Sequence, residues 1–447
     1  MTLSLSSLPE DILYNVFYFL SPVSILKVRQ VSKDLYSLTR QKIVWTNAYR
    51  TSNSFLPVEP PADASAFEVE RALLSAIKLD EAWRKPQPEH VCKRFLKYSP
   101  GRSDNIYIKL YHGRYLMIGS RSSFSFYDLD AKPEDWGRPI FGSGESESTY
   151  SIYRVNTDDS AKVSYISAVA MSRLPQYFIR IWQIDFVGKT LLQVADVPIG
   201  RNMSSFAKIT NGWLVHGANR QQGSNAFNAV LFHIPTRRIY EVPVYVPSPG
   251  SGEERIFQID YIIAPQHLLL MYISRRQTLF EAFPLPNTND TVINRVLSGS
   301  HSGICPSGFT ETTFVSASDQ AKRIRLLGSV ITGPARGMPG VRVFDVVLKR
   351  DGLISFPEEC YNNPMSGYNL HLTLSRSGAV RGICMAPTTF TLLRVDFGPT
   401  AAGDMQLDIT ELGLKMDGVI AYDVDFDGFR GRLCLVRDEG VMILDYI

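Results

Sequence analysis

The sequence has little of what marks nucleic-acid-binding or secreted proteins. Across 447 residues the formal net charge is only +3, and no segment concentrates Lys and Arg, so the electrostatic footprint of a nucleic-acid binder is missing. The five cysteines form an odd set with no CxxC pair or other metal-ligand spacing. We therefore expect reduced thiols, a location in the cytoplasm or nucleus, and no nucleic-acid partner.

Long apolar runs are scarce as well. The opening residues, MTLSLSSLPEDIL, lack a basic stretch followed by an apolar core, so we do not expect a signal peptide there. The most apolar run, at 259–273, is interrupted by Asp260 and Pro265, well short of the ~18 uninterrupted apolar residues that a membrane span needs. No membrane partner is expected.

Motifs for catalysis or cofactor binding are also missing. The seven histidines are scattered, with no HExxH or similar spacing. There is no GxSxG, and the Gly-rich segment at 333–340 lacks the Lys-Ser/Thr ending of a phosphate loop, so we interpret it as an inserted loop. We predict no catalytic residue, no cofactor and no enzyme activity.

One acidic stretch begins like a calcium loop. Asp423, Asp425 and Asp427 follow the DxDxDG spacing, but the ninth and twelfth positions are Gly431 and Cys434, where such loops need oxygen ligands. The stretch is better interpreted as a strand with carboxylates on one face that ends in an Asp-Gly turn. No metal site is predicted.

What is present is a folded composition in a long chain. Hydrophobic residues make up 45% and charged residues 20%, which leaves little room for a long disordered segment. Single cores stop growing near ~250–300 residues, so 447 residues require several domains or a repeat architecture.

The first fifty residues show helical periodicity. Ser7 is predicted to cap a helix, with Pro9 in its first turn and Glu10 completing a capping box. Apolar positions then recur at three- and four-residue steps until Ser21-Pro22 ends the run. They are Leu8, Ile12, Leu13, Val16, Phe17 and Leu20.

Two further helices are predicted in the same segment. A short one carries Ile25, Leu26 and Val28, and a third one is capped by Ser32. The apolar positions of this third helix are Leu35, Leu38, Ile43, Val44 and Trp45. Three short helices over about 45 residues can barely bury a core, so they need a partner surface.

The string LPEDILYNVFYFLSPVSILKVRQVSKDL, followed by Trp45, resembles the F-box family at nearly every position of its motif. In that family the exposed apolar face of the helices packs on a Skp-type adaptor, which is linked to a cullin. Carried over by position, the resemblance implies adaptor contacts at Leu8, Pro9, Ile12, Leu13, Leu26 and Val31. The alternative is an ordinary three-helix cap on the larger domain.

A connector follows the helices. The segment 57–63, PVEPPAD, is predicted to be an extended spacer. Residues 64–84 return to helical spacing, with an apolar side made of Phe67, Leu73, Leu74, Ile77 and Trp83. This helix either sets the angle between the two parts or packs as a helix of the second domain. The sequence ERALLSAIKLDEAWRKP also resembles the connector of F-box proteins from basidiomycete-type fungi.

Past residue 100, short strands alternate with turns marked by Gly, Asn and Pro. The clearest strand-turn-strand-turn-strand unit is 368–397. Seven units each close on an apolar residue followed by a polar one, 48 to 64 residues apart, which is typical of a propeller. These pairs are Tyr127-Asp128, Trp182-Gln183, Phe232-His233, Phe280-Glu281, Phe344-Asp345, Val395-Asp396 and Leu444-Asp445.

The last unit ends on its third strand, so its outer strand must come from elsewhere in the chain. The segment 90–99, HVCKRFLKYS, is predicted to supply that strand and to tie the two ends of the ring together. Otherwise an unpaired edge would remain. Endings such as ILDYI and IRIWQID resemble the third strand of WD-repeat blades, although the Gly-His start of that repeat is absent.

We therefore predict a mainly β protein with an F-box at 1–50, a linker and connector helix at 51–90, and a seven-bladed, WD-repeat-like β-propeller at 91–447. The resemblance implies a non-catalytic substrate receptor of an SCF-type E3 ubiquitin ligase, which binds a Skp-type adaptor, through it a cullin, and an unidentified protein substrate. One alternative is a propeller-fold hydrolase with a helical appendage, marked by Asp, Glu or His converging at the central channel. Another is an F-box protein in a non-degradative complex.

Overall fold

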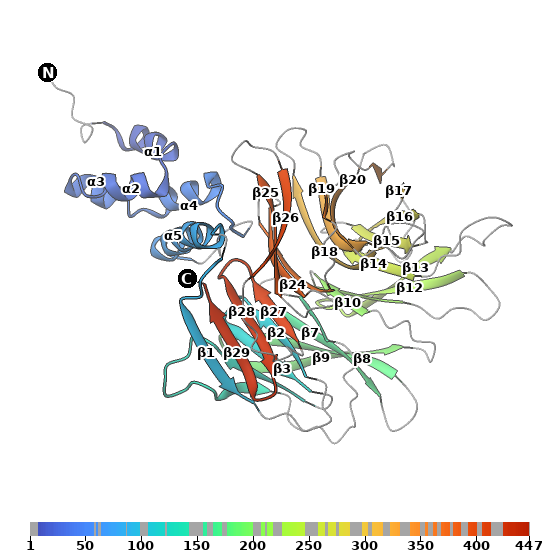
Figure 1. The fold of residues 1–447 in the computed structure, drawn as a ribbon. Helices are drawn as coiled ribbons and strands as arrows, with labels where there is room; N and C mark the ends of the chain where they lie inside the picture. Colours follow the sequence, from blue (N-terminus) through green and yellow to red (C-terminus); the bar gives the residue numbers. More distant parts are fainter. Residues whose placement is uncertain are drawn as a thin grey trace.

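The computed structural model divides the chain into a helical N-terminal part and a β part (Figure 1). It describes residues 8–57, 60, 64–85, 87–98, 106–120, 123–142, 155–158, 164–171, 177–199, 207–210, 212–217, 226–245, 258–263, 267–273, 277–286, 297–302, 306–315, 322–330, 340–348, 354–355, 361–363, 368–375, 379–385, 392–399, 405–412 and 423–446. The predicted cap residue Ser7, and 333–339 of the predicted inserted loop, lie outside this part of the chain.

The helical part contains five described helices. They are α1 (Glu10–Tyr18), α2 (Pro22–Val28), α3 (Lys33–Leu38), α4 (Lys42–Thr51) and α5 (Ala66–Trp83). The prediction of one helix across 33–45 is wrong, because the backbone of Gln41 is extended, with φ −74° and ψ 141°, and separates α3 from α4. None of the described helices is both long and apolar enough to cross a membrane.

The helix starts follow local capping chemistry. The side chain of Ser32 accepts a hydrogen bond from the backbone N–H of Leu35, as predicted. Ser21 caps α2 in the same way. The predicted start of α1 is wrong, because Pro9 is the N-cap and Glu10 is the first helical residue instead of the third. Proline at the N-cap costs no hydrogen bond, since the first N–H groups of a helix have no partner within it.

The described strands group into seven sheets, six of which are built from consecutive strands. These six comprise β2 (Tyr107–Tyr111), β3 (Tyr115–Gly119), β4 (Phe124–Asp128) and β5 (Pro139–Gly142); β6 (Val155–Asp158), β7 (Ser164–Met171), β8 (Tyr177–Asp185) and β9 (Thr190–Ile199); β10 (Ala207–Thr210), β11 (Trp213–His216), β12 (Ala226–His233) and β13 (Arg238–Tyr245); β14 (Gln258–Ile263), β15 (His267–Ile273), β16 (Gln277–Pro284) and β17 (Leu297–Ser302); β18 (Pro306–Val315), β19 (Lys322–Val330), β20 (Gly340–Leu348), β21 (Ile354–Ser355) and β22 (Tyr361–Asn363); and β23 (Tyr368–Leu374), β24 (Val380–Met385), β25 (Leu392–Pro399) and β26 (Met405–Glu411).

The remaining sheet is composite, with the order β1-β29-β28-β27. Its strands are β1 (Cys92–Lys97), β27 (Val424–Asp427), β28 (Arg432–Arg437) and β29 (Gly440–Asp445). Strand β1 pairs antiparallel with β29, from Cys92 opposite Asp445 to Lys97 opposite Gly440. The prediction that the segment 90–99 supplies the outer strand of the last unit is confirmed. We call this sheet the closing sheet.

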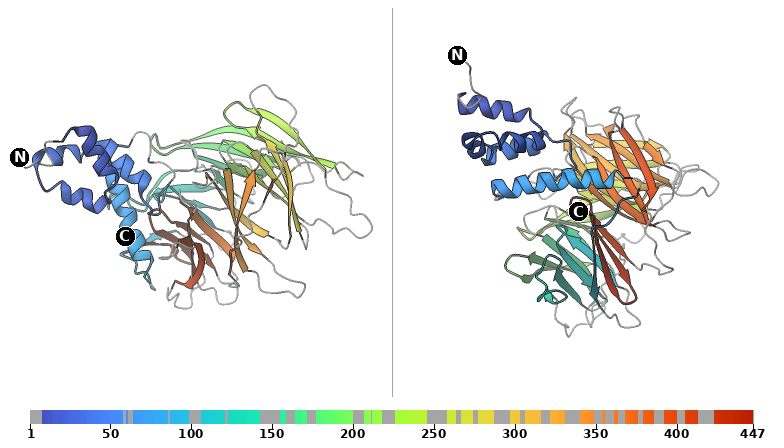
Figure 2. Two further views of the ribbon diagram at one scale, coloured as in Figure 1. Left: turned by 90° about the horizontal axis from the view of Figure 1, so that it is seen from above. Right: turned by 60° about the vertical axis from the view of Figure 1, so that its left-hand side comes forward.

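The sheets stand side by side around an axis in a β-propeller arrangement (Figure 2). Strand β2 of the first sheet lies against β27 of the closing sheet, so the ends of the β region meet. Each of the seven apolar-polar pairs identified in the sequence falls on the third strand of a sheet, counted outward from the axis. The predicted β-propeller after N-terminal helices is confirmed.

Candidate functional site

The four short helices leave apolar side chains on their outer surface. Ile12 is 42% exposed and Val31 is 72% exposed, Pro9 is exposed, and Leu8 and Leu26 are partly buried. These five residues, predicted as adaptor contacts, therefore keep surface that a partner could cover.

Leu13 differs from the other predicted contacts. It is only 2% exposed and lies in the core of the helical part. Ile12 and Leu13 are neighbours on a helix and so point about 100° apart, and only Ile12 can face a partner. Leu13 packs in this core, so its predicted adaptor contact has almost no exposed surface to rest on.

Sequence reasoning missed several exposed apolar side chains on the same helices. Phe19, at the end of α1, is 83% exposed. The periodic pattern could not separate these residues from core positions, because the short helices carry apolar residues on more than one side. The additional exposed side chains are Tyr18, Val23, Tyr36 and Ile43.

Trp45 lies in the core of the helical part, where polar groups and a cation surround it. Trp45 is fully buried, and its indole N–H donates to the carbonyl of Thr39 at 2.7 Å. The guanidinium of Arg29 lies 5.3 Å from the Trp45 ring centroid and makes two 2.8 Å contacts with Glu70 of α5. This bidentate pair ties the short helices to the connector helix.

Helix α5 belongs to two hydrophobic cores. Its first half contributes Val69, Leu73 and Ala76 to the core of the helical part. Its second half contributes Leu79 and Trp83 to a core that contains strands of the last two sheets. Figure 2 shows α5 running from the other helices onto the propeller. Both interpretations of the connector therefore hold, although Phe67, predicted on its apolar side, is 65% exposed.

A buried ion pair anchors α5 on the propeller. Asp80 contacts Arg381 of β24 and accepts a hydrogen bond from the backbone N–H of Phe55 at 3.1 Å. The Arg381 guanidinium lies 4.4 Å from the centroid of the Phe55 ring and donates to the carbonyl of Gly428 at 3.1 Å. Both charges are buried, so each depends on the other for compensation.

Trp83 forms the end of this anchor. Its ring stacks on Phe426 with 5.1 Å between the ring centroids, and its indole N–H donates a hydrogen bond to Asp396 at 2.7 Å. Arg394 donates to the carbonyls of Trp83 and Lys85 at the end of α5. Burial raises the pKa of the Asp396 carboxyl to about 6, an effect that the nearby Arg394 only partly opposes.

Two carboxylates next to and within β27 of the closing sheet form hydrogen bonds with the innermost strand of the first sheet. Asp423 and Asp425 accept hydrogen bonds from the backbone N–H groups of Ile108 and Leu110, at 2.8 and 2.6 Å. Alternate N–H groups of an edge strand point to the same side, and two Asp residues with the same spacing satisfy them. The first sheet and the closing sheet are thereby joined along their inner strands.

Asp425 has two further partners. His371 Nδ1 of β23 lies 2.9 Å from one of its oxygens, and Lys109 Nζ of β2 lies 3.3 Å from the other. Burial alone would raise the pKa of the Asp425 carboxyl, but Lys109 and His371 outweigh burial and hold this pKa below its usual range. One carboxylate therefore joins three sheets at the inner strands.

The calcium-loop spacing has a structural explanation. Asp427 accepts hydrogen bonds from the backbone N–H groups of Phe429 and Arg430, both at 2.8 Å. The side chains of Val424 and Phe426 are buried in the core beside α5. The described residues contain no cluster of His, Cys, Asp and Glu that could hold a metal ion. The strand that ends in an Asp turn is confirmed.

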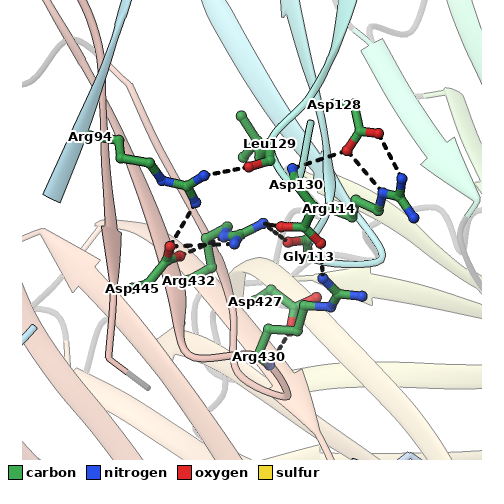
Figure 3. A network of polar contacts seen from close by, with 10 residues as sticks. All are labelled: Arg94, Gly113, Arg114, Asp128, Leu129, Asp130, Asp427, Arg430, Arg432 and Asp445. Atoms are coloured by element: carbon green, nitrogen blue, oxygen red, sulfur yellow. Dashed lines mark hydrogen bonds and ion pairs between the residues drawn. The ribbon is translucent and has the colours of Figure 1, made fainter. Parts of the chain in front are cut away.

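A second polar network joins the closing sheet to the first sheet (Figure 3). Arg432 contacts Asp445 at 2.5 Å, Asp130 at 2.9 Å and the carbonyl of Gly113 at 2.7 Å. Arg94 of β1 bridges Asp445 and the carbonyl of Leu129. The network therefore links β1, β28 and β29 to the β2–β3 and β4–β5 connections of the first sheet.

Comparison with known proteins finds a family match in the segment of the four short helices. Residues 5–51 match the model of the F-box-like family. No curated protein matches the chain.

Solved structures resemble the chain only distantly. The extracellular domains 1-2 of Drosophila Semaphorin 1a align at a TM-score of 0.44 and 9% identity over 80% of this chain and 88% of that one. Drosophila Semaphorin 2a aligns at 0.40 and 10% identity, over 79% and 75%. The C-terminal WD40 domain of Sif2 aligns at 0.39 and 8% identity, over 78% and 84%. At these values they say nothing about function.

Proposed function

We propose, on the premise that an F-box-like domain is joined to a β-propeller, that this chain is a non-catalytic substrate receptor of an SCF-type E3 ubiquitin ligase. The F-box-like helices bind a Skp-type adaptor and through it a cullin. The propeller recruits a protein substrate for ubiquitin-dependent degradation, and catalysis resides in other subunits. We place the complex in the cytoplasm or nucleus.

The observation that carries this proposal is the exposed apolar surface of the matched helices. Exposed apolar side chains that gather on one part of a protein mark an interaction site, and seven of the thirteen large apolar side chains that are exposed among the described residues lie in the matched segment. Ile12, Phe19 and Val31 all lie within residues 5–51 and stay exposed. They do so although the helical part already has a complete core of its own around Trp45.

The packing of α5 on the propeller supports the proposal that the propeller recruits the substrate. A receptor must hold its substrate at a fixed place relative to the adaptor, and a helix packed in both cores provides that constraint. We further propose that the closing sheet serves as the seventh blade of a WD-repeat-like ring, and that the connector is of the fungal type. The rim loops would present side chains to a substrate peptide.

Co-purification with a Skp-type subunit tests the adaptor half. Ile12→Glu and Val31→Glu each place a charge on exposed surface, so they should abolish capture of the adaptor while leaving the melting temperature unchanged. Val187→Glu, at a 93% exposed position of the propeller, is the matched control and should capture normally. Normal capture by both helix variants would refute adaptor binding through this face.

The non-degradative alternative shares the same adaptor contacts and differs in what the adaptor brings. Its test is the composition of the complex purified from cells. Cullin in stoichiometric amount supports the ligase, and an adaptor complex without cullin supports the alternative.

The hydrolase alternative has one observation in its favour. His371 and Asp425 form a hydrogen-bonded pair on inner strands of the propeller, as an inward-facing acid-base site would require. Hydrolysis of a panel of ester and phosphate substrates that His371→Gln abolishes, without a change in folding, would establish it. No turnover above that of the variant would leave this pair as a contact between sheets.

A further inference from the structure

Helix α5 belongs both to the core of the helical part and to the core beside the closing sheet. This helix has 18 residues, which corresponds to about 27 Å. Its sequence, AFEVERALLSAIKLDEAW, contains no glycine or proline where it could bend. Displacement at one end is therefore transmitted to the other.

The propeller end of α5 packs on the C-terminal strands of the β region. The ring centroid of Trp83 lies 5.1 Å from that of Phe426 in β27 and 5.4 Å from that of Tyr446, which follows β29. Leu79 fills the space beside Gly431, where even a Cβ would meet the Leu79 side chain at 2.5 Å. Few residues then separate Trp83 from β1, the outer strand of the same sheet.

Strand β1 is held to β29 beyond the regular ladder. The backbone N–H of Val91 donates to the carbonyl of Asp445 at 2.7 Å, just before the first ladder pair. The closing sheet thus contains strands from both ends of the β region. Helix α5 contacts this sheet through Trp83, next to Tyr446 just after the end of β29. Figure 1 shows the C-terminal end of the chain beside α5.

We infer that the helical part and the closing sheet form one cooperative unit through α5, so that a partner bound to the helices tightens the ring at its closing sheet. The reverse holds by reciprocity, because a coupling free energy acts equally in both directions. An intact closing sheet therefore increases affinity for the partner. The identity of that partner, a Skp-type adaptor, rests on the proposed function.

Hydrogen exchange of the full chain, without any partner, tests the coupling itself. Ile25→Ala opens a cavity in the helical core at a fully buried position that lies outside the core around Trp83. Exchange of the amides at 424–446 should then accelerate by about fivefold, the lower end of typical coupling factors. The β10–β13 sheet, remote from α5, should exchange at the wild-type rate.

A second arm measures the partner's effect. Binding of a purified Skp-type subunit should slow exchange at 424–446, and Trp83→Ala should abolish that protection and weaken binding by about fivefold. Trp213→Ala, which removes the same side chain from the β10–β13 sheet, is the matched control and should leave both unchanged.

The outcomes separate the two proposals. Wild-type exchange at 424–446 in Ile25→Ala, or equal effects of Trp83→Ala and Trp213→Ala, would overturn the coupling. Failure of the wild-type chain to bind the adaptor would refute the proposed function, and the Ile25→Ala arm would still decide the coupling.

Discussion

The buried pair between Asp80 and Arg381 gives the sharpest test of how α5 is anchored. In Asp80→Ala the guanidinium of Arg381, 7% exposed at its side chain, loses its carboxylate and stays in a site closed by Phe55 and Trp83. Removing one partner of a buried ion pair costs about 3–5 kcal/mol, because the remaining charge is uncompensated. The N–H of Phe55 also loses its acceptor, which costs about 1–3 kcal/mol by itself.

A second substitution should restore part of the stability that Asp80→Ala loses. Arg381→Met in the Asp80→Ala background removes the orphaned charge and keeps an apolar stem of similar length. Replacing a whole buried pair by apolar residues is often neutral or stabilising, so the double variant should be more stable than Asp80→Ala by at least about 2 kcal/mol. The missing acceptor for Phe55 remains in both variants and cancels in this comparison.

The assay is urea unfolding followed by tryptophan fluorescence, with hydrogen exchange of α5 to locate the loss. Glu134→Ala, at an exposed site remote from α5, is a control for removal of a carboxylate and should change stability by less than about 0.5 kcal/mol. A loss below about 1 kcal/mol in Asp80→Ala, or a double variant no more stable than it, would show that the pair does not anchor the helix.

Two further predictions concern the same anchor. The buried hydroxyl of Tyr446 has no hydrogen-bond partner among the residues that the structure describes, so Tyr446→Phe should leave the melting temperature unchanged or raise it; a clear drop would reveal a partner for the hydroxyl. Because the pKa of Asp396 is raised from 3.8 to about 6, the folded chain holds a proton that the unfolded chain has released, and stability falls as pH rises through that window. Asp396→Asn, which still accepts from Trp83, should flatten melting temperature against pH between 4 and 6, and an unchanged slope would contradict this origin.

Local sequence rules identified the elements that depend on near neighbours. The cap at Ser32 and the Asp turn at Asp427 were predictable, because each needs only groups within three residues. The pairing of β1 with β29 was predictable for another reason, since an incomplete last unit leaves an edge that something must cover.

The contacts that sequence reasoning missed join residues far apart in the chain. Asp80 and Arg381 are separated by 301 positions, and nothing near Asp80 distinguishes it from a solvent-exposed helix residue. The burial of Leu13 in the helical core is not predictable from the motif, because the motif does not say which of two neighbouring apolar residues packs inside the chain's own core. The break between α3 and α4 was missed because apolar periodicity continues across Gln41.

The register of β1 on β29 also determines how the protein resists being pulled apart. Cys92, at the start of β1, lies opposite Asp445, at the end of β29. A force applied between α5 and the chain just after Asp445 therefore acts at one end of the ladder and breaks its hydrogen bonds one at a time. Pulling in this direction unzips the strands, whereas shear would load all the bonds together, so a molecular unfolding machine that pulls this way meets less resistance from this ladder than one that shears it.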